Sequence, residues 1–303
     1  MVRASVRPGA QPEMSPQLRE VLCASPIGLH RLAYWEWRPQ GAAAASAPTV
    51  LCAHGLTRNG RDFDHLAARL SQRYRVICPD MAGRGRSQWL ADSSLYSVPQ
   101  YVADCVTLIA RLDVERLAWV GTSMGGLIGL SLASLPGNPL TALVLNDIGP
   151  VIDLDGLARI GTYVGKAPTL DSYEQALDYV RQTAAGFGPH DAQGWDALSR
   201  HYWIQQPDGR WRAHYDPRIA EPFRGYLGQP PLDLWPVYDA ISCPTLLTRG
   251  AQSDLLSCET AQQMCRRGPR ARLVEFAGVG HAPTFIPVDQ IDVVDQFLLE
   301  HFQ

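Results

Sequence analysis

The sequence predicts an α/β fold: a mostly parallel central sheet with helices on both faces, and an inserted helical cap. Continuous apolar runs at 48–55, 74–80, 116–121 and 140–147 are typical of strands buried on both faces. Segments with helical spacing lie between them, and such alternation gives right-handed crossovers and a parallel sheet. No buried strand is apparent over 151–235, and the pattern resumes afterwards, which indicates an insertion.

The remaining core elements follow the same reading. The aromatic, alternating stretch 27–37 suits a strand or hairpin near the sheet edge. Helical spacing predicts helices over 62–74, 98–112 and 123–136, and a terminal amphipathic helix over 294–302. Apolar runs predict two late strands, over 243–250 and 271–278.

This reading divides the chain into three parts. Residues 1–24 lack the apolar stretch of a secretory signal, so we expect a flexible lead-in. Residues 25–150 and 236–303 should form the α/β core, with the Ala-rich segment 41–48 as a linker. Residues 151–235 should form the helical cap, which is rich in Trp and Tyr.

Composition limits the classes of partner. The 303 residues carry a net charge of −3, so no basic excess attracts nucleic acid. No apolar run approaches the roughly 20 residues of a membrane helix, so no membrane association is expected. The seven cysteines are scattered without CxxC spacing, which favours reduced thiols in a cytoplasmic protein and argues against a zinc site. We expect a monomer or homodimer acting on a small molecule.

The stretch WVGTSMGGLIG at 119–129 contains the first candidate catalytic residue, Ser123. In a GxSxG motif between a strand and a helix, glycines flank a sharp turn that projects the serine hydroxyl above the sheet. A serine that merely caps a helix is the alternative. The strand before Ser123 and the helix after it favour the nucleophile.

Acyl transfer also requires two amide donors aimed at the oxyanion. The backbone N–H of Met124, directly after the serine, is the first candidate. The second is the N–H of Leu56, in the AHGL segment 53–56 that follows a buried strand. Both positions lie at the strand ends that should face Ser123.

His281, in the glycine-rich segment GVGHAPTF, is the candidate general base. It is the histidine that follows a late core strand, and a loop there can place its imidazole over the serine. The other seven histidines fall in edge, helical, terminal or inserted segments, or in the AHGL segment.

Two aspartates compete for the role of the acid that orients His281. Asp254, in GAQSDLLS, lies between Ser123 and His281 in the chain and matches the order Ser, Asp, His of this architecture. We favour it. Asp147, in LVLNDIGP, ends the strand after the serine and is the alternative acid, although a turn role beside Gly149 and Pro150 would also explain it.

With these motifs the chain resembles the α/β-hydrolase superfamily from about residue 25 onward. The matching segments are AHGL at 53–56, PDMAGRGRS at 79–87, GTSMGG at 121–126, RGAQSDLL at 249–256 and GVGHAP at 278–283. The PDMAGRGRS loop lacks the lysine and spacing of a P-loop, so we interpret Arg84 and Arg86 as structural or surface residues. The resemblance implies a Ser–His–Asp hydrolase with a helical cap and without metal or cofactor.

The resemblance also narrows the reaction. Serine at the sharp turn between the strand and the helix argues against epoxide hydrolases and haloalkane dehalogenases, which use aspartate at this position. Bacterial carboxylesterases, some acting on aliphatic polyesters, are most similar, so we expect cleavage of apolar carboxylic esters. Lactonases and C–C bond hydrolases of meta-cleavage products would use the same triad, and a non-catalytic ligand receptor is the alternative from another class.

The cap should supply the substrate pocket. Tyr202, Trp203 and Trp211 are the candidate contact residues, because aromatic side chains commonly line apolar pockets. The alternative is that most of these rings form the small core of the cap itself.

Overall fold

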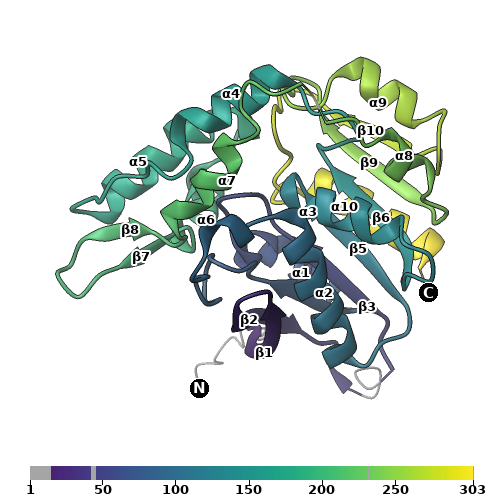
Figure 1. The fold of residues 1–303 in the computed structure, drawn as a ribbon, viewed down its shortest axis with the longest axis horizontal. Helices are drawn as coiled ribbons and strands as arrows, with labels where there is room; N and C mark the ends of the chain where they lie inside the picture. Colours follow the sequence, from purple (N-terminus) through teal and green to yellow (C-terminus); the bar gives the residue numbers. More distant parts are fainter. Residues whose placement is uncertain (1–14, 42–45, 231, 303) are drawn as a thin grey trace, which may run out of the picture.

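The computed structural model describes residues 15–41, 46–230 and 232–302. Its centre is an 8-stranded sheet (Figure 1). In spatial order the strands are β1 (Gln17–Ser25), β2 (Gly28–Trp37), β4 (Arg75–Pro79), β3 (Thr49–Ala53), β5 (Leu117–Thr122), β6 (Leu140–Asn146), β9 (Thr245–Gly250) and β10 (Arg272–Phe276).

The sheet is parallel from β4 to β10 and antiparallel at its other edge. There β1 and β2 form a hairpin, which pairs with β4 through β2. The expected lead-in over 1–24 is therefore wrong for residues 17–24, which belong to β1, whereas residues 1–14 lie outside the described part. Polar residues alternate along β1 because one of its faces meets solvent. The segment therefore lacks the continuous apolar run from which the other strands were predicted.

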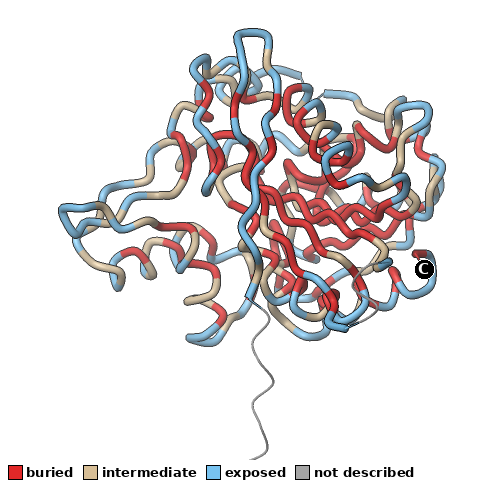
Figure 2. Tube along the Cα trace, turned by 90° about the horizontal axis from the view of Figure 1, so that it is seen from below, coloured by how far each residue is buried: buried red, intermediate tan, exposed pale blue. Residues whose placement is uncertain are grey.

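Helices cover both faces of the sheet, as predicted. On one face lie α2 (Val98–Leu112), α3 (Met124–Ala133), α8 (Trp235–Asp239) and α9 (Cys258–Met264). On the other face lie α1 (Asp64–Leu70) and α10 (Val288–His301). Figure 2 shows the buried strands running between these two layers. The last helix begins earlier than the apolar pattern predicted, after Pro287, because its first turn is largely polar.

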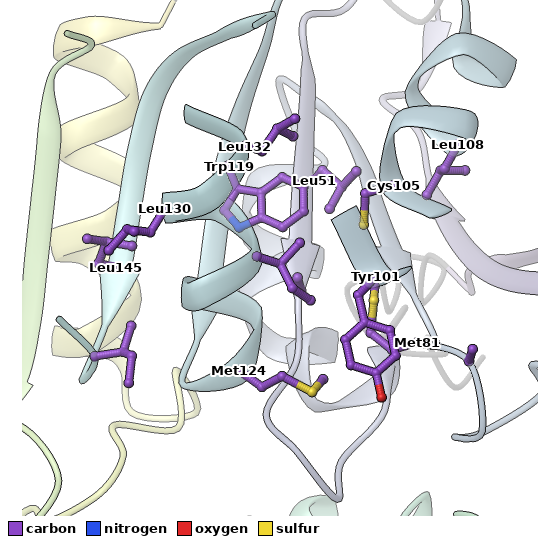
Figure 3. Packing of buried hydrophobic residues seen from close by; sticks show 14 of the residues in the cluster. Leu51, Met81, Tyr101, Cys105, Leu108, Trp119, Met124, Leu130, Leu132 and Leu145 are labelled. Carbon is purple, nitrogen blue, oxygen red and sulfur yellow. The ribbon is translucent and has the colours of Figure 1, made fainter. Parts of the chain in front are cut away.

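The helix after Ser123 packs directly on the sheet. Trp119 of β5 is fully buried beside Leu51 of β3, and its indole N–H donates to the carbonyl oxygen of Gly125 at 3.0 Å (Figure 3). This bond joins the strand before the serine to the first turn of α3. The bond therefore helps to hold the turn between β5 and α3, which contains Ser123, in place.

The cap lies between β6 and β9 and forms a lobe beside the sheet in Figure 1. Its elements are α4 (Leu154–Tyr163), α5 (Tyr173–Thr183), α6 (Ala192–Arg200), β7 (Trp203–Gln205), β8 (Trp211–Ala213) and α7 (Ala220–Arg224), with short 3-10 turns at Ala185–Phe187 and Pro217–Ile219. The expected helical cap is thus corrected in one respect, because it also contains the antiparallel pair β7 and β8. These strands are too short to show a strand pattern in the sequence.

The cap is fastened to the core through the loop after β4. The amide of Gly85 donates to the carbonyl of His214 at 2.9 Å, and that of Asp216 donates to Gly83 at 2.7 Å. The Tyr96 hydroxyl also donates to the Asp216 carboxylate. Within the described residues, no helix is both long and apolar enough to cross a bilayer.

Candidate active site

Ser123 occupies a strained turn at the carboxyl end of β5. Its φ of 52° and ψ of −116° lie in a region that side chains rarely adopt. The flanking glycines permit this turn, because a Cβ on Gly121 would lie 2.3 Å from the Gly125 oxygen, and one on Gly125 only 1.9 Å from the Ala53 oxygen. Glycine is therefore required at both positions, because backbone atoms approach closely on each side of the serine.

Three side chains form a continuous hydrogen-bonded chain at this edge of the sheet. His281 Nε2 lies 2.9 Å from Ser123 Oγ, and His281 Nδ1 lies 2.7 Å from Asp147 Oδ2. The carboxylate accepts a hydrogen bond from the Nδ1–H group, which leaves Nε2 free to accept the proton of the serine hydroxyl. Asp147 is fully buried and His281 is nearly so.

Asp147 is held by the strand beside it. Directly after β6, its amide donates to the Thr248 carbonyl at 2.8 Å, and its Oδ1 accepts the Gly250 amide at 2.9 Å. Ser253 Oγ donates to the same Oδ2 that faces His281, at 2.5 Å. These donors stabilise the ionised carboxylate in a buried position.

The prediction that Asp254 orients His281 is corrected by this geometry. Asp254 instead faces the cap, where Arg159 of α4 donates to both of its carboxylate oxygens, at 2.9 Å for Oδ1. The hydrogen bonds from Arg159 lower the pKa of Asp254 below its usual value. Asp147, the alternative acid, occupies the position beside the histidine.

Asn146 is a structural residue of the site that the sequence did not reveal. Its Nδ2 donates to Thr122 Oγ1 at 3.0 Å and to the Pro283 carbonyl at 2.8 Å, while its Oδ1 accepts from Thr248 Oγ1. It thereby joins the serine strand to the histidine loop. The available signal in the sequence was an asparagine at the end of an apolar strand, directly before an aspartate.

His54 orients the peptide that carries the Leu56 amide. Its Nδ1 donates to the Gly55 carbonyl at 2.7 Å, and its Nε2 accepts the Met81 amide at 2.9 Å. Complete burial lowers the pKa of His54 to about 3, so this neutral tautomer persists at physiological pH. The peptide is trans, so the Leu56 N–H points away from His54. Gly55 lies beside Ser123: a Cβ on Gly55 would be 3.8 Å from the serine Cβ.

Arg84 supports both candidate oxyanion residues from beneath. Its Nε donates to the Leu56 carbonyl at 2.9 Å, and its Nη2 contacts Met124 Sδ at 3.6 Å. Nη1 donates to the hydroxyl of Tyr101, whose ring lies near Met124 in Figure 3. Arg84 is fully buried, whereas Arg86 is exposed, so the two arginines divide between the structural and surface roles expected for them.

A narrow cavity of about 80 Å³ opens onto Ser123 and His281. From the core it is lined by the 54–58 loop together with Asp62 and Phe63. The cap contributes apolar side chains: Ile160, Tyr163, Phe187 and Leu198.

The predicted pocket residues Tyr202, Trp203 and Trp211 are not part of this lining, which corrects that expectation. Trp203 packs edge-on against Tyr179 and Tyr202, and Trp211 packs against Tyr173. Their aromatic rings build the core of the cap, and Ile160, Tyr163, Phe187 and Leu198 line the cavity instead.

One group of potential metal ligands lies in the described part of the chain, away from the serine. Cys23 and His30 are cross-strand neighbours in the β1–β2 hairpin, and Asp104 faces them from α2, with ligand atoms within 4.8 Å of one another. His30 Nε2 lies 3.0 Å from Asp104 Oδ2, and Gln100 donates to Oδ1. These bonds fasten the hairpin to α2.

Fold and site together define the class of α/β proteins that hydrolyse substrates with a histidine-activated serine. The model of the alpha/beta hydrolase family matches residues 50–293. A 3-hydroxybutyrate-oligomer hydrolase of Cupriavidus necator is 49% identical over 290 residues, which cover 93% of this chain and 98% of that protein.

Solved structures agree. A putative hydrolase from Rickettsia typhi is 32% identical with a TM-score of 0.85, covering 94% of this chain and 99% of that one. An alpha/beta hydrolase from Novosphingobium aromaticivorans is 35% identical with a TM-score of 0.84, covering 94% and 98%. The chain belongs to the alpha/beta hydrolase family, and the expectation of this fold and family is confirmed.

Proposed function

We propose that this hydrolase cleaves the ester bonds of short 3-hydroxybutyrate oligomers through an acyl-enzyme intermediate on Ser123. The observation that carries the proposal is the hydrogen-bonded chain from Ser123 through His281 to Asp147. The oligomer hydrolase that is similar along 93% of this chain supports the substrate class.

In the first step, Ser123 Oγ attacks the ester carbonyl carbon while His281 Nε2 accepts the hydroxyl proton. The carbonyl oxygen becomes an oxyanion, which the backbone amides of Leu56 and Met124 stabilise. Asp147 stabilises the imidazolium through Nδ1. His281 then donates its proton to the leaving alkoxide, the carbon–oxygen bond breaks, and the alcohol departs.

In the second step, water replaces the alcohol. His281 Nε2 accepts a proton from the water as its oxygen attacks the acyl carbon. Collapse of the second tetrahedral intermediate breaks the bond to Ser123 Oγ, which takes back the proton from His281. The products are a hydroxy acid and the free enzyme. Neither step changes an oxidation state, so the reaction needs no redox partner.

The cavity size supports a small acyl unit. A volume of about 80 Å³ corresponds to roughly three waters at liquid density, so the enclosed part of the site is suited to a short acyl unit. A 3-hydroxybutyryl unit, with its four carbons and two oxygens, is such a short acyl unit. The apolar cap side chains suit its methyl group, and polar atoms of the 54–58 loop suit its oxygens.

Hydrolysis of a 3-hydroxybutyrate trimer by the purified protein, followed by release of the monomer, tests the proposal. Ser123→Ala should reduce kcat/KM by about 10⁴-fold or more, because the nucleophile is removed. Unchanged melting of the variant would show that the fold is intact. A fluorophosphonate probe should label the wild type but not this variant.

Ester and carbon–carbon cleavage are separated by adding p-nitrophenyl butyrate and a ring-fission dienone as substrates. The proposal expects turnover of the trimer and of the nitrophenyl ester. Turnover of the dienone alone would reassign the enzyme to C–C hydrolysis, and near-normal activity of Ser123→Ala would refute the mechanism.

A further inference from the structure

Arg58 brings a permanent positive charge into the cavity that contains Ser123 and His281. It follows Leu56 by two residues, and its amide donates to the Gly55 carbonyl at 3.1 Å. The turn that positions the candidate oxyanion amide therefore also positions Arg58. The mechanism above uses neither its charge nor its donors.

The guanidinium is held rigidly by both the core and the cap. Nε and Nη2 donate to the two carboxylate oxygens of Asp62 at 2.6 and 2.7 Å. Nη2 also donates to the Leu198 carbonyl on α6 at 2.7 Å, and the Tyr202 ring covers the guanidinium 4.9 Å from its centroid. The side chain is only 11% exposed.

These contacts leave one nitrogen for a ligand. A guanidinium has five N–H donors, and the three bonds above use the Nε–H and both hydrogens of Nη2. The remaining two hydrogens are on Nη1, which has no acceptor within the described residues. Because Arg58 lines the cavity, this fixed nitrogen can bind an oxygen atom of the substrate there.

The charge of the pair limits which ligand fits. Asp62 offsets the positive charge of Arg58 and also lines the cavity. A multiply charged anion would meet the Asp62 carboxylate, whereas a single acyl oxygen needs only a donor. The matching group is a carbonyl or carboxylate oxygen. In a hydroxybutyrate oligomer, every scissile ester has a second acyl oxygen nearby.

We propose that Arg58 Nη1 forms a second polar subsite, which binds the carbonyl or carboxylate oxygen of the acyl unit adjacent to the scissile ester. This inference rests on the proposed function and names a specificity-determining residue for it. The subsite makes the enzyme selective for esters that contain a second acyl group. Simple alkyl esters of the same size leave Nη1 without its acceptor.

Three substrates with the same scissile ester test this selectivity. They are the hydroxybutyrate dimer with its free carboxylate, the methyl ester of that dimer, and sec-butyl 3-hydroxybutyrate, in which a methyl group replaces the second acyl group. The wild type should show a kcat/KM at least about tenfold higher for the dimer or its methyl ester than for the sec-butyl ester, since a charge-assisted hydrogen bond is lost.

The methyl ester separates the two sources of the oxygen. If it is cleaved as well as the dimer, the subsite binds an ester carbonyl. If it falls to the level of the sec-butyl ester, the subsite requires the terminal carboxylate. Equal kcat/KM for all three substrates would overturn the subsite while leaving ester hydrolysis intact, and no cleavage of any of them would instead refute the proposed function.

Substitution identifies the residue. Arg58→Lys keeps a positive charge for Asp62 but loses the planar fork, so the ratio of dimer to sec-butyl ester should fall to about one. Arg61→Lys is the matched control. Arg61 also makes paired bonds to a nearby carboxylate, Asp64, and covers the Trp35 ring, but it does not line the cavity.

Arg61→Lys should keep the wild-type ratio. A folded Arg58→Lys variant that keeps the wild-type ratio would overturn the assignment of Arg58. If that variant melts well below the wild type, Arg58→Gln provides the same comparison, because the ratio of two substrates in one variant cancels the loss of folded protein.

Discussion

The loops that follow β6 and β9 each place an aspartate at the same edge of the sheet, yet the two residues have opposite environments. Asp147 is fully buried, has a positive φ and faces His281. Asp254 is more than one-third exposed and pairs with Arg159 of the cap. One loop completes the site, and the other fastens the cap over it.

The difference shows that the order of residues in the chain does not determine which aspartate lies beside His281. Both aspartates lie between Ser123 and His281 in the sequence. The choice depends on the strand register, which pairs Asn146 of β6 with Thr248 of β9 and leaves Asp147 directly above the end of β9. In the loop after β9, Ser253 faces the site and its neighbour Asp254 faces away from it.

Among the substitutions that test this comparison, Asp147→Asn should have the largest effect on activity. An amide that donates to His281 Nδ1 favours the tautomer with its proton on Nε2, which cannot accept the serine proton. We expect kcat for ester hydrolysis to fall by about 10³-fold to 10⁴-fold. Steady-state kinetics on p-nitrophenyl butyrate would measure it.

The fold should survive Asp147→Asn, because asparagine adopts a positive φ as readily as aspartate. Thermal melting provides the control. If activity stays within tenfold of the wild type in a folded variant, Asp147 is not the acid.

Ser253→Ala should have an intermediate effect. It removes the hydroxyl that donates to the Asp147 oxygen facing His281. Loss of one hydrogen bond to a carboxylate should lower kcat about tenfold. Ser253→Thr keeps the hydroxyl and should recover most of the rate. Equal losses in both variants would show that loop packing, and not the hydroxyl, is responsible.

Asp254→Asn should change kcat less than about threefold, because the residue contacts neither His281 nor the serine. The measurement is the same assay as for Asp147→Asn, with protein prepared in parallel. A loss approaching that of the Asp147 variant would restore Asp254 as the acid and contradict the arrangement in the structure.

The smallest expected effect of Asp254→Asn is on stability. Arg159 lowers the pKa of Asp254 in the folded protein, so the pair stabilises the fold above the unfolded-state pKa and this contribution is lost as pH falls through the lowered value. For a partly exposed pair the free energy of unfolding should decrease by less than about 1 kcal/mol at pH 7.

Urea unfolding at pH 7 and below pH 3 would measure that dependence. The difference between wild type and variant should shrink at the lower pH. A difference that grows as the solution is acidified would have the wrong sign for a lowered pKa.

Much of the core was predictable because its strands are buried on both faces. The runs that contain β3, β4, β5 and β6 are almost wholly apolar, so their positions followed from the sequence. The elbow at Ser123 was predictable for a different reason. Its backbone approaches neighbouring chain so closely that only glycine fits at Gly121 and Gly125.

The acid, the pocket and Arg58 were not predictable, because each depends on contacts between distant segments. Asp147 required the register of β6 against β9. Tyr202, Trp203 and Trp211 were expected at the substrate, but large rings are also what a small lobe needs for its own core. The position of Arg58 depends on α6 of the cap, 140 residues further along the chain.

The burial of His54 has a consequence for how the rate should respond to acid. Its pKa of about 3, and values of about 4 for His201 and His214, both also lowered mainly by burial, mean that these imidazoles take up no proton in mildly acidic solution. The hydrogen bonds of His54 to Gly55 and Met81 should therefore persist as the solution is acidified, and the contribution of the Leu56 amide to the rate should stay constant there.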